Sequence, residues 1–142
     1  MEESRKILIV ADDEASTQEL AQKIAFIITP PAFDSYSVSV LKSDTFYGTD
    51  ILPVHAFFLG CGLPSPSTFA YIEMLFGRIN LARRACGVFS SNPRALKYLS
   101  NIVRVSEASV GKPLFAKNGK VDDARLREWV KNTLEPKVKG LL

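Results

Sequence analysis

The alternation of apolar and polar stretches along the chain predicts strands that alternate with helices. Near the amino end, Lys6–Val10 forms an apolar run, a polar turn follows, and apolar residues then recur at helical spacing. An unbroken apolar run is typical of a parallel strand covered on both faces, and the helical spacing predicts an amphipathic helix over 16–28. This stretch therefore predicts a buried strand that delivers a loop to the start of a helix, which is where open α/β sheets bind ligands.

The same alternation continues to the carboxyl end. The patterns predict strands at 6–10, 36–41, 55–60, 85–90 and 110–116, helices at 16–28, 67–79 and 93–107, and a last helix capped by Asp122 or Asp123. Residues 42–53 carry no helical stripe and are expected to be mostly loop. Strands that alternate with helices form a parallel sheet with right-handed crossovers. We therefore expect one α/β domain over 1–142, an open twisted five-stranded sheet in the order 2-1-3-4-5 with helices on both faces.

The composition excludes several classes of protein. Lys and Arg number 18 against 15 Asp and Glu, a net charge of +3 that is scattered along the chain, so no nucleic-acid surface is expected. No apolar run approaches the roughly 20 residues of a membrane helix, and the acidic Met1–Arg5 segment does not resemble a secretory signal. Cys61 and Cys86 are too few for a disulfide scaffold and are expected to be free thiols, which makes the cytoplasm the expected location.

The first strand, its loop and the helix resemble the phosphate-loop signature of flavodoxins. The matching positions are Leu8, Ile9, Ala15, Thr17, Ala21 and Ile24. The chain departs from the signature at Val10, where the family has an aromatic residue, and at Asp12, where it has a hydroxyl. Residues 50–60, 109–115 and 122–129 also resemble stretches of flavodoxins, so the likeness extends over nearly the full length and implies a flavodoxin-like fold.

This resemblance implies an FMN-binding electron carrier that works with a redox partner protein and has no catalytic acid or nucleophile of its own. Flavodoxins wrap the FMN phosphate with backbone N–H groups and hydroxyls at a helix N-terminus. The ring would lie between the loops that follow the third and fourth strands. The implied cofactor-binding residues are Asp12, Ala15, Ser16, Thr17, Gly60, Cys61, Gly62, Ser90, Ser91 and Asn92.

The loop chemistry opposes this implication. Asp12, Asp13 and Glu14 put three negative charges beside the phosphate, in a loop without glycine. Each repulsion at a few ångströms is worth roughly 1–4 kcal/mol, depending on solvation. The two loops that would hold the flavin ring, 61–67 and 90–93, contain no aromatic residue.

A second family, the response-regulator receiver domains, resembles the same loops. Asp12-Asp13-Glu14 is similar to their acidic magnesium-binding opening, Leu63-Pro64 to the turn after their third strand, and Lys112-Pro113 to their fifth-strand Lys-Pro. Their phosphate-accepting aspartate would stand at Gly60, so this chain lacks acyl-phosphate chemistry. The alternative function is therefore a partner-binding module without flavin, whose contact edge is formed by 63–66 and 91–93.

Several polar or aromatic residues have two interpretations. The acidic cluster Asp12-Asp13-Glu14 either holds a divalent cation or complements the helix dipole. Ser16 and Thr17 are helix caps or phosphate ligands. The only histidine, His55, opens a strand without a visible Ser or Cys partner and is interpreted as structural. Trp129 lies on an apolar helix stripe and is expected in the core. The oligomeric state is left open.

Overall fold

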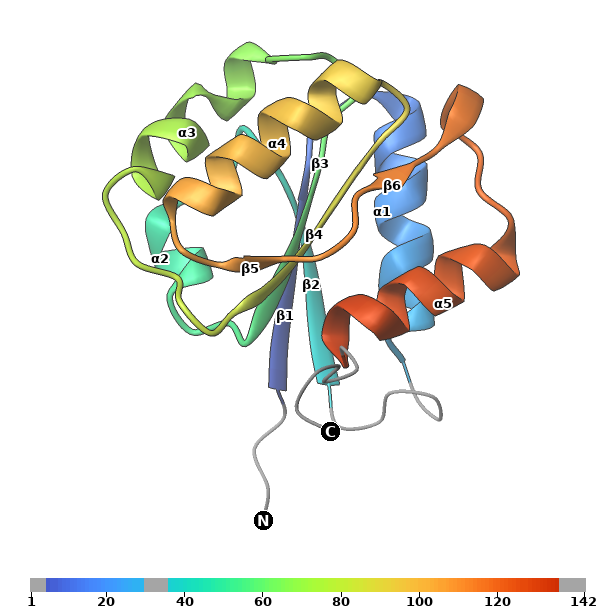
Figure 1. Cartoon of the computed structure of the whole chain (residues 1–142), viewed down its shortest axis with the longest axis horizontal. Helices are drawn as coiled ribbons and strands as arrows, with labels where there is room; N and C mark the ends of the chain where they lie inside the picture. Colours follow the sequence, from blue (N-terminus) through green and yellow to red (C-terminus); the bar gives the residue numbers. More distant parts are fainter. Residues whose placement is uncertain (1–4, 30–35, 136–142) are drawn as a thin grey trace.

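The computed structural model of the chain describes residues 5–29 and 36–135 (Figure 1). Its strands are β1 (Arg5–Ala11), β2 (Tyr36–Lys42), β3 (Ala56–Gly60), β4 (Ala85–Ser90), β5 (Ser109–Val110) and β6 (Leu114–Phe115). Its α-helices are α1 (Ala15–Ile27), α2 (Gly48–Ile51), α3 (Ala70–Phe76), α4 (Pro93–Val105) and α5 (Asp123–Leu134), and two 3₁₀ turns are η1 (Ser67–Phe69) and η2 (Lys117–Gly119). None of the described helices is long and apolar enough to cross a bilayer.

The strands form one parallel sheet in the order β2-β1-β3-β4-β5, with β6 also paired to β4. The predicted order 2-1-3-4-5 is thereby confirmed. In the register, Ile9 of β1 lies opposite Val40 of β2 and Phe58 of β3. The first strand is therefore central, and the loop that follows it emerges beside the loop that follows β3.

The prediction of one continuous fifth strand over 110–116 is wrong. The segment pairs with β4 in two short pieces, first through Val110 opposite Cys86 and then through Leu114 opposite Phe89. Between the two pieces stands Pro113, which has no backbone N–H to donate to a ladder. The carbonyl of the preceding Lys112 instead accepts a hydrogen bond from the Trp129 indole at 2.7 Å.

Some helix ends also differ from the predictions. The helix predicted over 67–79 begins as the 3₁₀ turn η1 and ends at Phe76, followed by Gly77. The loop predicted over 42–53 contains one helical turn, α2. At the start of α1 the N-cap residue is Glu14, so Ser16 and Thr17 both lie inside the first turn and neither caps the helix. Helix α4 ends at Val105, two residues before the predicted end at 107.

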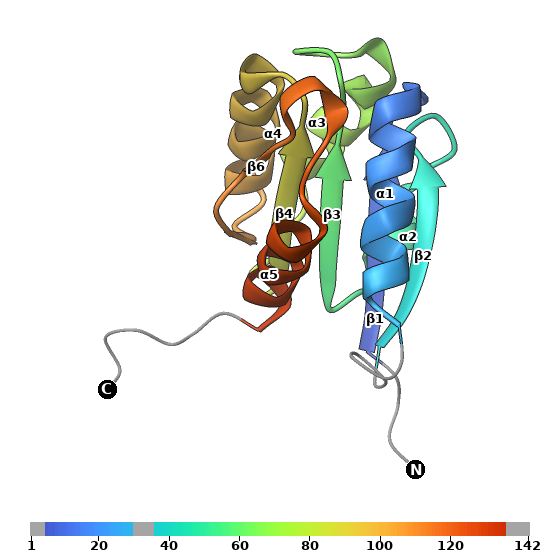
Figure 2. The ribbon, with the colours of Figure 1, turned by 90° about the vertical axis from the view of Figure 1, so that its right-hand side faces the viewer.

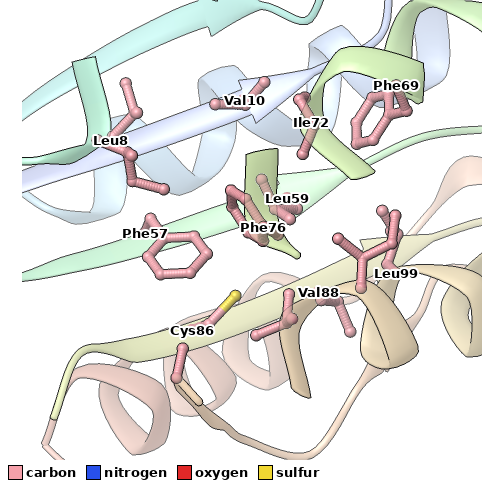
Figure 3. Packing of buried hydrophobic residues seen from close by; sticks show 14 of the residues in the cluster. Leu8, Val10, Phe57, Leu59, Phe69, Ile72, Phe76, Cys86, Val88 and Leu99 are labelled. Atoms are coloured by element: carbon pink, nitrogen blue, oxygen red, sulfur yellow. The ribbon is translucent and has the colours of Figure 1, made fainter. Parts of the chain in front are cut away.

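Helices cover both faces of the sheet, as Figure 1 shows with α3 and α4 on one side and α1 and α5 on the other. On the α3–α4 side the side chains of β1, β3 and β4 pack against the helices (Figure 3), and the rings of Phe57 and Phe76 meet edge to face at 5.7 Å. On the α1–α5 side, Phe58 lies 5.4 Å from Trp129, which is 8% exposed and confirms the core interpretation of that residue. His55 Nδ1 accepts a hydrogen bond from the Lys6 backbone N–H at 3.0 Å, in agreement with its structural interpretation.

Candidate functional site

Three loops meet where the carboxyl ends of β1, β3 and β4 come together at one edge of the sheet (Figure 2). The register sets Ala11 of β1 opposite Gly60 of β3, and Gly60 opposite Phe89 of β4. The residues that follow these three positions are consequently neighbours in space. This edge contains most of the residues that the sequence singled out.

Asp12 is the polar centre of this edge. It is only 4% exposed. Its Oδ2 accepts a hydrogen bond from the Gly62 backbone N–H at 2.9 Å, and its Oδ1 accepts one from the Glu14 N–H at 3.3 Å. Its backbone carbonyl accepts a hydrogen bond from the Gln18 side-chain amide at 2.7 Å. One carboxylate thus ties the loop after β1 to the loop after β3 and to the start of α1.

The Glu14 carboxylate lies against the same two loops. Its Oε1 accepts a hydrogen bond from the Ser16 hydroxyl at 3.2 Å. A Cβ added at Gly62 would come within 2.1 Å of Glu14 Oε2, so the carboxylate lies directly over the Gly62 backbone. Ser16 is also covered by η2, because a Cβ on Gly119, whose φ is +76°, would lie 2.8 Å from Ser16 Cβ.

The polar groups after β4 also find partners within the chain. Ser90 is 1% exposed; its hydroxyl donates to the Cys61 carbonyl and accepts from the Asn92 N–H at 2.9 Å. The Asn92 side-chain oxygen accepts a hydrogen bond from the Arg94 N–H at 2.9 Å and caps α4. Ser90 therefore joins the loop after β4 to the loop after β3, and Asn92 fixes the helix that follows.

Gly60 and Cys61 lie in closely packed surroundings at this edge of the sheet. A Cβ on Gly60 would lie 2.2 Å from the ring of Phe89, so the missing side chain makes room for that ring. Cys61 is buried, and its thiol donates to the Leu63 carbonyl at 3.2 Å. Burial, followed by the negative charges of Asp12 and Glu14, raises the pKa of the Cys61 thiol to about 12. At neutral pH the thiol is thus protonated, which disfavours a role as a nucleophile.

The remaining sequence-predicted residues lie around this cluster without joining its hydrogen bonds. Ala15 is exposed at the first position of α1, Thr17 is buried within the same first turn, and Ser91 is half-buried after β4. The sequence did not single out Gln18, whose amide holds the Asp12 carbonyl. A glutamine one or two residues after a predicted helix cap is an ordinary surface residue in sequence, so no signal marked it.

Three of the donors at this edge are already used by the chain's own carboxylates, which opposes the binding of an FMN phosphate there. A phosphate monoester needs N–H and O–H donors and a positive or neutral surrounding. Here the Gly62 N–H, the Glu14 N–H and the Ser16 hydroxyl already donate to the chain's own carboxylates. A bound phosphate would displace these carboxylates and then lie beside their negative charges.

Within residues 5–29 and 36–135, no group of three or more His, Cys, Asp or Glu side chains is arranged to hold a metal ion.

Comparison with known proteins identifies the fold. No protein-family model and no curated protein matches the chain. Among solved structures, the chain is similar to a short-chain flavodoxin associated with a non-canonical PDU bacterial microcompartment, with a TM-score of 0.75, 11% identity, and coverage of 93% of this chain and 97% of that one. A flavodoxin from Streptococcus pneumonia TIGR4 gives a TM-score of 0.73 at 15% identity, covering 92% of this chain and 98% of that one. Oxidised flavodoxin 2 from Bacillus cereus gives a TM-score of 0.72 at 16% identity, covering 93% of this chain and 99% of that one. The chain therefore has a flavodoxin-like fold along nearly its whole length.

Proposed function

We propose that this chain is a protein-binding module that uses a flavodoxin-like fold without FMN. The observation that supports the proposal is the buried Asp12 carboxylate, which accepts hydrogen bonds from Gly62 and Glu14 across the edge where a flavodoxin-like site would hold a phosphate. The loops after β1 and β3 are joined by this side chain directly. They need no bound group to hold them in place.

The loop after β3 is suited to contact a protein. Leu63 is 57% exposed, and Pro64 and Ser65 beside it are exposed as well. The residues on either side of this tip are anchored, because the Gly62 N–H donates to Asp12 and Pro66 is buried. A loop that is already held in one conformation loses little conformational entropy on binding. An apolar tip on a fixed loop is therefore the contact that we assign to the partner.

A photo-cross-linking residue at position 63 tests this contact in cells that express the full chain. Val105 is a matched control, since it is 63% exposed but lies at the end of α4, at the opposite edge of the sheet from the strands' carboxyl ends. We expect position 63 to yield a discrete adduct with another protein and position 105 to yield none. Equal adducts at both positions, or none at position 63, would refute the partner assignment.

A second candidate function is the FMN electron carrier, which the full-length structural likeness to flavodoxins favours. In that case Ala15, Ser16 and Thr17 would hold the phosphate, the ring would lie between the loops after β3 and β4, and a redox protein would be the partner. FMN would supply the redox chemistry, while Asp12 and Glu14 would have to release their present donors. A purified protein that absorbs in the visible blue would favour this candidate over the first.

A further inference from the structure

Helices α1 and α5, which face the viewer in Figure 2, border a groove. The groove has a volume of about 460 Å³. We call it the α1–α5 groove; the charged residues that line it are Glu19, Lys23, Asp123 and Arg127. Ile27 and Leu126 are buried and form its apolar floor. The groove lies toward the carboxyl end of α1, away from the Asp12 edge.

Phe26 lines this groove and is itself largely exposed to solvent. At 71% exposure it is the most exposed large apolar side chain in the described part of the chain. A phenylalanine ring left in water on a helix forgoes most of the stabilisation that full burial of such a side chain provides. The groove thus combines a buried apolar floor with an exposed apolar ring on its wall.

The charges around the groove are balanced. On α1, Glu19 and Lys23 are one turn apart and form an ion pair at 3.7 Å. On α5, Asp123 and Arg127 repeat the same acid-to-base order at the same spacing. Each helix therefore contributes one acid and one base. In a two-fold contact a patch meets its own copy, so a patch of one sign repels itself and a patch with both signs can pair with itself.

We infer that the partner of the α1–α5 groove is a second copy of this chain, related by a two-fold axis. In this dimer Phe26 of each copy enters the groove of the other, and the acids of one copy face the bases of the other. Because a two-fold axis repeats every contact, the Phe26 ring would be buried in the groove on both sides of the interface. We expect a weak dimer, with a Kd between about 5 μM and 1 mM.

Sedimentation velocity of the full chain from about 5 μM to 1 mM tests the dimer. The wild-type mass should rise from 15.7 kDa toward twice that value. Phe26→Ser should raise the Kd at least about 30-fold, the effect of a hot-spot residue. The control Val105→Ser removes a similarly exposed apolar side chain from α4 and should leave the Kd unchanged.

A charge exchange separates this contact from a general loss of apolar surface. In the proposed contact Lys23 of one copy faces Glu19 of the other, so Lys23→Glu places two acids opposite each other and should weaken the dimer. Adding Glu19→Lys restores one acid and one base and should recover the wild-type Kd within about threefold. A wild type that stays monomeric at 1 mM overturns the inference, and so does a dimer that Phe26→Ser and Val105→Ser affect equally. The outcome is independent of the Leu63 cross-link, which detects a partner at the other end of α1.

Discussion

Replacing Asp12 with alanine is expected to lower the free energy of unfolding by about 2–4 kcal/mol. The change removes the acceptor for the Gly62 N–H, which is buried, and for the Glu14 N–H, which is partly buried. A buried donor left without a partner costs about 1–3 kcal/mol. Urea unfolding followed by circular dichroism should show a lower midpoint with an unchanged slope, the pattern of lost stability without a change in the unfolded state.

Asp13 is the matched control for Asp12. It is the next residue, carries the same charge and is exposed. Asp13→Ala should change stability by no more than about 0.5 kcal/mol. Asp12→Asn keeps the shape of the side chain but offers only one acceptor oxygen. Its loss of unfolding free energy should therefore fall between those of Asp12→Ala and Asp13→Ala. If Asp12→Ala and Asp13→Ala behave alike, the buried carboxylate does not hold the loops together.

The Cys61 thiol is expected to react with iodoacetamide about 10³-fold more slowly in the native protein than an ordinary thiol does at pH 8. Its pKa of about 12 leaves roughly one molecule in 10⁴ ionised at that pH, compared with roughly one in ten for the ordinary value of 9.0. Mass spectrometry of the alkylated protein would locate the label. Glu14→Gln removes one of the charges that raise this pKa, so it should speed the labelling of Cys61 while Cys86 stays unreactive.

The same pKa shift predicts how stability depends on pH. The native thiol holds its proton to higher pH than the unfolded thiol, so the stabilisation is complete below pH 9 and is lost as the pH rises from 9 toward about 12. Over that range Cys61 contributes a decline of roughly 1.4 kcal/mol per pH unit. Cys61→Ala should remove this part of the decline and leave the part due to Cys86. Fast labelling of native Cys61 at pH 8 would contradict its placement in a buried, negatively charged environment. The same decline of stability with pH in the wild type and in Cys61→Ala would contradict it as well.

The sequence predicts the fold because burial follows simple periodicity in this chain. The apolar runs that became β1, β3 and β4 are central strands, and the predicted fourth strand over 85–90 has the observed bounds. The fifth strand was mispredicted because the apolar residues around Pro113 fit a continuous strand, and periodicity carries no information on which backbone donors a ladder needs. Only the tertiary structure shows that the Lys112 carbonyl is taken by Trp129.

The position of the site could be predicted from the sequence, but the hydrogen bonds that its polar side chains form could not. The acidic triplet at 12–14 predicts repulsion toward a phosphate, yet nothing in the triplet shows that Asp12 turns inward while Asp13 and Glu14 remain exposed. That difference depends on the Gly62 N–H, which comes from a residue 50 positions away. Likewise, the turn chemistry of Ser90 does not reveal that its hydroxyl holds the Cys61 carbonyl.

Titration of FMN with the purified chain tests the central claim most directly. FMN fluorescence is followed as protein is added up to about 100 μM, with a flavodoxin as the positive control. Because the Gly62 N–H, the Glu14 N–H and the Ser16 hydroxyl already donate to Asp12 and Glu14, we expect no saturable quenching over this range. Saturable quenching with a Kd below about 1 μM, equivalent to more than about 8 kcal/mol of binding free energy, would show that the carboxylates do not close the site.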